Sequence, residues 1–285
     1  MSAQTLLVVI DPVTDDQMAL RRAVSLALET QAQLHLFCCT YLTDDEMGSF
    51  SSRKDAKHTQ VTSTKQWLEE LAEPVRAQGI KVRCEVVWNQ KWEVMVAQSA
   101  GRIGAKFVVK TSFKHSKLER ALRRTSDIYL MRTSPCPVLL VKADDDWQNG
   151  IVVAAISLED GQSSHDQLNN KIVSQAQQLA NATKAELHLV SAVHHSANLR
   201  DLFQLTDSDD HPPAEMVAQR FGVATNRVHL VDGAAIDVIP DSVQKLHADL
   251  LVMGTVARTG LAATVLGNTA EKVLDQLSVD LFSVS

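Results

Sequence analysis

The stretch AQLHLFCC at residues 32–39 returns as AELHLVSA at residues 185–192. Two further stretches return at a common spacing of 143 residues: KFVVKT (106–111) corresponds to DLLVMG (249–254), and PVLLVK (137–142) to DLFSVS (280–285). Self-similarity of this kind indicates one structural unit written twice. The joint falls in the polar stretch DDDWQNG at residues 144–150, which has the composition of a turn. The sequence therefore predicts two domains, over residues 1–143 and 149–285.

Each half alternates short runs of Val, Ile and Leu with longer amphipathic stretches. The runs cover residues 6–10, 34–39, 82–87, 107–109 and 138–141 in the first half, and 151–156, 187–193, 227–231, 250–253 and 281–284 in the second. Runs that are apolar on consecutive residues are typical of strands buried on both faces of a parallel sheet, and the intervening helices supply the crossovers. We expect an α/β fold of two repeated, doubly wound, five-stranded parallel-sheet domains.

Ligands of such sheets bind beyond the carboxyl ends of the strands, an edge that we call the mouth of the domain. The expected first mouth contains Asp11 and Thr111, and the second contains Ser157 and Gly254. These four residues follow or end the first and fourth strands of each half.

Composition narrows the class of protein. The chain has 285 residues, of which 45% are hydrophobic, and a net charge of −6. That charge argues against nucleic acid as a partner, because broad nucleic-acid affinity needs a basic face. No apolar stretch approaches the roughly 20 residues of a membrane span, and the N-terminus resembles no signal peptide. We expect a cytoplasmic protein. The four cysteines, Cys38, Cys39, Cys84 and Cys136, lack the spacing of a metal or disulfide framework and are interpreted as small apolar residues.

The stretch GTVARTGLAATVLGNTAE at residues 254–271 follows the fourth strand of the second half. With VVIDP at residues 8–12 and the doubled AxLHL strands, it makes the whole chain resemble the universal stress protein family, and more closely its tandem, two-domain members. Family members that bind ATP carry Gly-x2-Gly-x9-Gly-(Ser/Thr) here and an aspartate that ends the first strand. The resemblance implies the universal stress protein fold, related to that of the adenine nucleotide alpha hydrolases. It also implies a non-enzymatic, cytoplasmic role in stress survival, including resistance to DNA damage.

Laid onto the second half, the motif of the family selects seven candidate ligand-binding residues: Ser157, Ala192, Gly254, Ala257, Gly267, Asn268 and Thr269. Glycines allow backbone N–H groups to approach phosphate, and the following helix adds its N-terminal dipole. Ala257 adds a methyl group to this cradle, and Asn268 offers an amide in place of a hydroxyl. Ser157 stands where the family has its aspartate. We therefore expect weak or absent ATP binding, and in the second domain only.

The first half has the opposite loss. Asp11 is kept, but Thr111 and Lys114 stand at the glycine positions of the motif, and Arg124 and Thr125 at its later Gly-Ser positions. We expect no nucleotide there and interpret Asp11 as a strand-end cap or as the N-cap of the next helix. The same region is rich in cations: Lys110, Lys114, Lys117, Arg120, Arg123, Arg124 and Arg132. They form either a solvated face or an anion site.

Histidines suggest metal binding only weakly. His194 and His195 are adjacent on an expected strand end and would point to opposite sides, and His211 lies in an acidic loop. No metal site is expected. His35 and His188 occupy equivalent strand positions and are interpreted as hydrogen-bonded core residues.

Three functions stay open at this stage: a non-enzymatic stress-response protein, a switch that binds ATP in the second domain, and a binder of another anionic or amphipathic small molecule. No cofactor is assigned with certainty. We expect the two domains to pack as an intrachain pseudo-dimer through their fifth strands, because family dimers use that edge and an open apolar edge strand invites aggregation. Further association into a homodimer is left open.

Overall fold

The computed structural model of the chain describes residues 4–112, 126–158, 163–193, 213–255 and 268–285. The chain folds into two compact units, Met1–Asp144 and Asp145–Ser285. No helix within the described ranges combines the length and the apolar character that crossing a bilayer requires.

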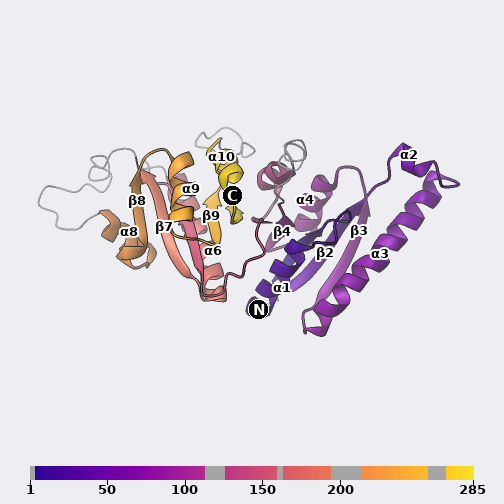
Figure 1. Cartoon of the computed structure of the whole chain (residues 1–285), viewed down its shortest axis with the longest axis horizontal. Coiled ribbons are helices and arrows are strands. Elements are labelled where there is room, and N and C mark those ends of the chain that lie inside the picture. The colour runs from indigo at the N-terminus through magenta and orange to yellow at the C-terminus, as the bar shows by residue number, and fades with distance from the viewer. Residues whose placement is uncertain (1–3, 113–125, 159–162, 194–212, 256–267) are drawn as a thin grey trace, which may run out of the picture. The chain divides into compact units, whose positions relative to one another are not determined.

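The first unit contains five parallel strands in the order β3-β2-β1-β4-β5. Its elements are β1 (Thr5–Ile10), α1 (Met18–Thr30), β2 (Gln33–Thr40), α2 (Asp44–Met47), α3 (Arg53–Ala77), β3 (Val82–Trp88), α4 (Trp92–Ile103), β4 (Phe107–Thr111) and β5 (Val138–Val141). Residues 126–133 form a further helix before β5. Helices α3 and α4 cover opposite faces of the sheet (Figure 1). All residues of the inner strand β4 are buried, as a sheet covered on both faces requires.

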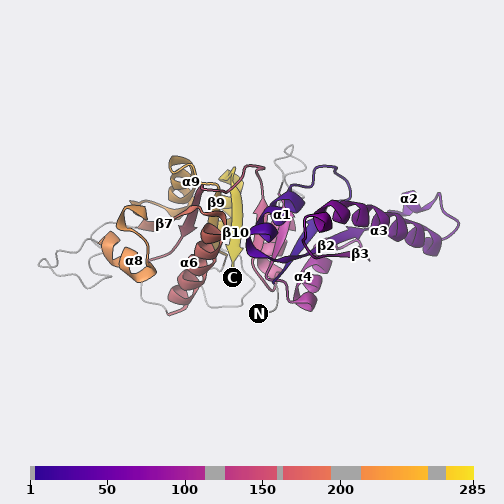
Figure 2. The same ribbon diagram turned by 90° about the horizontal axis from the view of Figure 1, so that it is seen from below.

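The second unit repeats this topology, with its five parallel strands in the order β8-β7-β6-β9-β10. Its elements are β6 (Ile151–Ala155), α6 (Ser163–Thr183), β7 (Glu186–Val193), α8 (Pro213–Phe221), η1 (Thr225–Arg227), β8 (Val228–Asp232), α9 (Ala235–Lys245), β9 (Leu250–Gly254), α10 (Asn268–Gln276) and β10 (Asp280–Val284). Helices α6 and α9 lie on opposite faces of this sheet (Figure 2).

The α/β fold with doubly wound parallel sheets is thus confirmed, and each predicted strand agrees with its observed bounds to within two residues. Helix α6 differs more, because the apolar pattern predicts a helix over residues 172–182 and the structure begins it at Ser163. Residues 166–171, ahead of the predicted start, are mostly polar and exposed, so hydrophobic periodicity could not reveal them.

A polar network interrupts the apolar core of the first unit. His35 on β2 lies 2.6 Å from the Glu85 carboxylate on β3, measured from Nε2 to Oε2. Glu85 also accepts hydrogen bonds from Ser99, at 2.7 Å, and Arg102, at 2.6 Å, both on α4. The prediction that His35 is a hydrogen-bonded core histidine is confirmed. Burial alone would raise the pKa of Glu85, but its bonds to Ser99 and His35 and the charge of Arg102 outweigh burial and hold that pKa below its usual value.

We predict that Glu85→Gln lowers the free energy of unfolding at pH 7 by about 1 kcal/mol, the typical worth of one hydrogen bond, since Arg102 is well exposed and its charge is screened. The folded-state pKa of Glu85 is depressed, so its contribution is present above the ordinary glutamate pKa and is lost as pH falls through the folded value. Urea unfolding at pH 7 and at pH 3 measures this. The two proteins should differ at pH 7 and converge in acid, and an equal difference at both pH values would contradict the assignment.

Candidate functional site

The second mouth lies at the carboxyl ends of β6, β7 and β9. The strand registers place Ala155 of β6 beside Val190 of β7 and Met253 of β9, so the residues just beyond share one edge of the sheet. Ser157, Ala192 and Gly254 are all partly exposed there. Asn268 and Thr269 open α10, and Thr269 is exposed. Ala257 and Gly267 lie outside the described residues.

A buried amide fixes the backbone at the entrance of this mouth. Asn169, on α6 and 2% exposed, accepts a hydrogen bond from the Ser157 N–H through Oδ1 at 3.1 Å. Its Nδ2 donates to the Ser157 carbonyl at 2.7 Å. Both main-chain polar groups of Ser157 are therefore satisfied by one side chain, and the side chain of Ser157 carries no charge toward the mouth. Sequence analysis missed Asn169, because a lone polar residue in a helix gives no periodic signal.

The first unit has the same arrangement, made by a different residue. Gln17 Nε2 donates to the Asp11 carbonyl at 2.8 Å, and its Oε1 accepts from the Asp11 N–H at 3.3 Å. Asp11 Oδ1 accepts from the Val13 N–H at 3.0 Å, which is the predicted strand-end cap. The alternative that Asp11 is the N-cap of the next helix is wrong, because α1 begins at Met18 with Gln17 before it.

Thr111 fills the place that Gly254 holds in the second unit. Its hydroxyl oxygen accepts a hydrogen bond from the Ala19 N–H in the first turn of α1 at 2.9 Å, across 92 residues of sequence. One of the unpaired donors of that helix terminus is thereby satisfied from within the protein. The mouth of the first unit is occupied at this point by its own side chain.

Gly254 packs closely against α6. A Cβ atom at this position would lie 2.8 Å from Leu168 Cδ2 and 3.3 Å from Ile172 Cδ1. The φ angle of Gly254 is not in the left-handed region, so backbone freedom is not the reason for glycine here. The space above this glycine is taken up by the first helix of the unit.

Lys110 corrects the interpretation of the basic segment as one solvated or anion-binding face. It is 8% exposed, and its Nζ donates to Asp127 Oδ1 at 2.7 Å and to the Thr111 carbonyl at 2.8 Å. Ser112 donates to the other oxygen of Asp127 at 2.6 Å, and Lys110 lies over the ring of Trp92. Of the other cations, Arg132 is exposed, whereas Lys114, Lys117, Arg120, Arg123 and Arg124 lie outside the described residues.

The profile of the universal stress protein family matches residues 3–142 and again residues 164–284. The chain belongs to the universal stress protein family. The resemblance expected from the sequence is confirmed, and so is the tandem organisation, with two universal stress protein domains in one chain.

Relatives of the same tandem length include universal stress protein E of Escherichia coli K12, which is 32% identical over 99% of this chain and 93% of the relative. Universal stress protein E of Photorhabdus laumondii is 34% identical over 99% of this chain and 94% of the relative. A functionally unknown protein from Pseudomonas aeruginosa PAO1 is similar in structure, with a TM-score of 0.79, 30% identity and coverage of 99% and 92%. The chain is accordingly a stress-response protein of this family.

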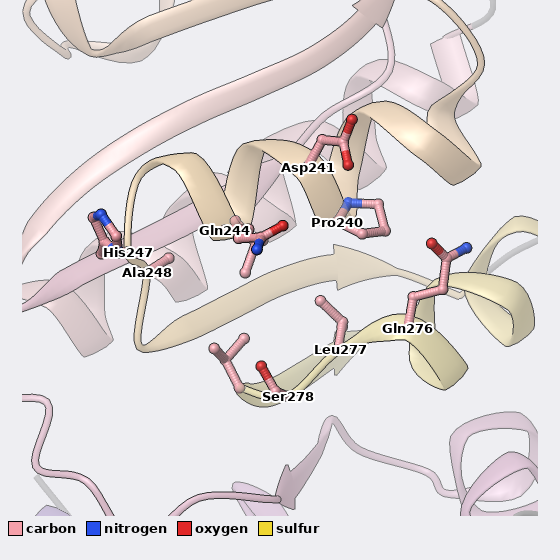
Figure 3. Close-up of a pocket in the computed structure, with 10 residues that line it drawn as sticks. Pro240, Asp241, Gln244, His247, Ala248, Gln276, Leu277 and Ser278 are labelled. Atoms are coloured by element: carbon pink, nitrogen blue, oxygen red, sulfur yellow. The ribbon is translucent and has the colours of Figure 1, made fainter.

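A second hollow of this universal stress protein lies at the opposite edge of the second sheet (Figure 3). It has a volume of about 480 Å³ and is formed where α9 leads into β9 and α10 leads into β10. The side chains of Gln244 and Gln276 come from the two helices, with Leu277 between them. This hollow is at the amino ends of β9 and β10, so it contains none of the candidate ligand-binding residues.

The buried and half-buried cysteines of the first universal stress protein domain are not activated as thiolates. Burial raises the pKa of Cys38 to about 12 and those of Cys39 and Cys84 to about 11, so these thiols stay protonated. Within the described ranges, no cluster of three or more His, Cys, Asp or Glu side chains could hold a metal ion. His194, His195 and His211 lie outside those ranges.

We predict that Gly254→Ala lowers the free energy of unfolding by about 1 to 3 kcal/mol, the usual cost of overpacking, because the new methyl group meets Leu168. In a Leu168→Ala background the same substitution should cost much less, since the obstructing atoms are gone. Chemical unfolding of the four proteins in this double-mutant cycle measures the coupling. Additive costs would show that Leu168 is not the obstacle.

We predict that Asp127→Ala lowers the free energy of unfolding by about 3 to 5 kcal/mol, because it leaves the buried Lys110 cation uncompensated. The second unit supplies the matched control. By the spacing of 143 residues, Met253 corresponds to Lys110 and Ala270 to Asp127, and both are buried. The double variant Lys110→Met with Asp127→Ala should therefore regain most of the loss in urea unfolding, and a double variant as unstable as the single one would refute this account.

Proposed function

We propose that this universal stress protein acts in the cytoplasm without chemical turnover, supports survival under stress including DNA damage, and binds magnesium ATP weakly or not at all. The observation that carries the proposal is the end of β6. Ser157 stands where ATP-binding family members have an aspartate, and the backbone around it is held by the buried Asn169. A neutral hydroxyl in this position gives no charge with which to orient a metal-bound triphosphate.

The first unit is proposed to hold no nucleotide. Thr111 and the Lys110–Asp127 pair occupy the end of β4 with internal bonds, so phosphate would have to displace satisfied, buried groups. Breaking such bonds without replacement leaves unpaired polar atoms, which costs about 1 to 3 kcal/mol for each.

The second mouth keeps a weak attraction for anions, because α10 begins at this edge with Asn268 and Thr269. The alternative ligands are therefore ATP itself in the second domain, or another anionic or amphipathic small molecule. The mass and ultraviolet absorbance of material released from the purified, denatured protein distinguish them. Near-stoichiometric nucleotide would favour a switch that binds ATP in the second domain. A lipid or sugar phosphate would favour a binder of another anionic or amphipathic small molecule.

We predict that calorimetric titration with magnesium ATP gives affinity two to three decades weaker than a complete site would. Three departures, Ser157, Ala257 and Asn268, at about 1 to 1.5 kcal/mol each, total roughly 3 to 4.5 kcal/mol, and each 1.4 kcal/mol is tenfold. Ser157→Asp combined with Ala257→Gly should recover part of the binding.

The matched control is Asp11→Ser, which removes the corresponding carboxylate from the first unit and should leave binding unchanged. Low-micromolar binding by the unmodified chain would defeat the proposal. Phosphate release from ATP above the uncatalysed rate would show turnover and defeat the non-enzymatic part.

A further inference from the structure

The two units differ on the third strand, at the position beside the histidine of the second strand. His35 in β2 pairs with Leu7 of β1, and His188 in β7 pairs with Val153 of β6. Two residues further along these strands, Phe37 pairs with Glu85 of β3, and Val190 pairs with His229 of β8. The register therefore puts His229 where the first unit has Glu85.

The exchange replaces a pair of an imidazole and a carboxylate by two stacked imidazoles. His188 Nδ1 lies 2.9 Å from His229 Nε2, and the ring planes are within 8° of parallel. A hydrogen bond between two ring nitrogens needs one N–H donor and one unprotonated acceptor. If both rings become imidazolium, both nitrogens carry hydrogen, the bond is lost, and two positive charges face each other in a partly buried site.

Among the residues that the structure describes, few charges near the pair can offset that change. Glu186 of β7 lies 3.6 Å from His188 Nε2, longer than a hydrogen bond, and it is already ion-paired with Arg227 of η1 at 3.0 Å. Helix α9, which packs on β7, turns inward its buried residues Val238, Ile239, Ser242 and Val243. Its charged residues, Asp237, Asp241 and Lys245, are exposed. Helix α8, which packs on β8, buries Val217 and Ala218, while its charged residues are Glu215 and Arg220, the latter ion-paired with Asp166 of α6.

We propose that the His188–His229 pair is a proton-sensitive element that loosens the outer strands of the second unit on acidification, while the first unit, with Glu85 at the same place, is unaffected. Burial lowers the pKa of both imidazoles. The charge of Arg227 lowers the pKa of His188 further, whereas Glu186 raises it, and the net direction is down. At His229, the neighbouring His188 adds to the lowering by burial. The folded unit thus binds protons less readily than the opened one. Stability contributed by the pair is present at pH 7 and declines as pH falls below the ordinary histidine pKa of about 6.5.

Loosening at this pair reaches the second mouth. Strand β7 carries Ala192 at its carboxyl end, where Ala192 pairs with Val231 of β8. The Gly233 N–H, just after β8, donates to the Val193 carbonyl at 3.1 Å and ties the two strand ends together. Separation of β8 from β7 would therefore deform the same edge that presents Ser157 and Gly254, whatever ligand that edge holds.

The test is amide hydrogen exchange of the full chain between pH 7.5 and pH 5.5, corrected for the intrinsic pH dependence of exchange. Protection of β8 should fall, by up to tenfold per pH unit for each suppressed protonation once the pH is below about 6.5. Protection of β3 in the same molecule serves as the internal control and should stay constant. Constant protection in β8, or an equal loss in β3, would overturn the proposal.

His229→Glu is the matched variant, because it rebuilds the network of the first unit. Ser242 and Lys245 hold the places of Ser99 and Arg102 at the spacing of 143 residues, so the partners of a carboxylate are already present. This variant should abolish the acid-induced loss, and an undiminished loss would overturn the proposal. Should the variant fail to fold, imidazole NMR titration of the unmodified chain decides. Two separated steps below the ordinary histidine pKa are expected, and one overlapping titration at that value would refute the coupling.

Discussion

One buried amide in each unit fastens the first helix to the residue that follows the first strand. Gln17 bonds both the N–H and the carbonyl of Asp11, and Asn169 bonds both the N–H and the carbonyl of Ser157. The main-chain N–H and carbonyl of Asp11 and of Ser157 are therefore bonded to a side chain and not to a neighbouring strand. The first helix is thereby held against the carboxyl ends of the strands. The packing at Gly254 and the hydrogen bond of Thr111 depend on that position.

The glycine of the second unit and the threonine of the first are two responses to the same helix. In the second unit α6 comes so close that a Cβ atom at position 254 would have to displace the side chain of Leu168. In the first unit a side chain is accommodated, and Thr111 uses its hydroxyl to accept from the N-terminus of α1. The same constraint therefore leaves a partly exposed Gly254 in one copy and an internally bonded Thr111 in the other, without any change in strand order.

The sequence predicted the fold well because its strands are buried on both faces and are apolar on consecutive residues. It also predicted which residues follow the strand ends of the second unit, because Ser157 and Gly254 follow from strand order, whereas Ala192 came from the resemblance to the family. It could not reveal the amide contacts of Gln17 and Asn169, because a single polar residue has no period. Lys110 was misjudged for a related reason: its charge is local in the sequence, but its partner Asp127 is brought to it by the fold.

The duplicated chain separates two demands that a single domain must meet together. In a stable sheet, the buried polar side chains keep their hydrogen-bond partners under all conditions. In a sheet that responds to pH, some of these side chains keep their partners only over part of the pH range. On the third strand, the first unit has Glu85, which is bonded to His35, Ser99 and Arg102. The pKa of Glu85 is held below its usual value, so this carboxylate stays charged across the neutral range. The second unit has His229 beside His188. Their hydrogen bond exists only while one of the two facing nitrogens, His188 Nδ1 and His229 Nε2, carries hydrogen and the other does not. Because each unit is compact by itself, the second can lose protection at β7 and β8 while the first keeps its fold. Duplication thus allows one half of the chain to remain a stable scaffold while the other changes with the proton concentration.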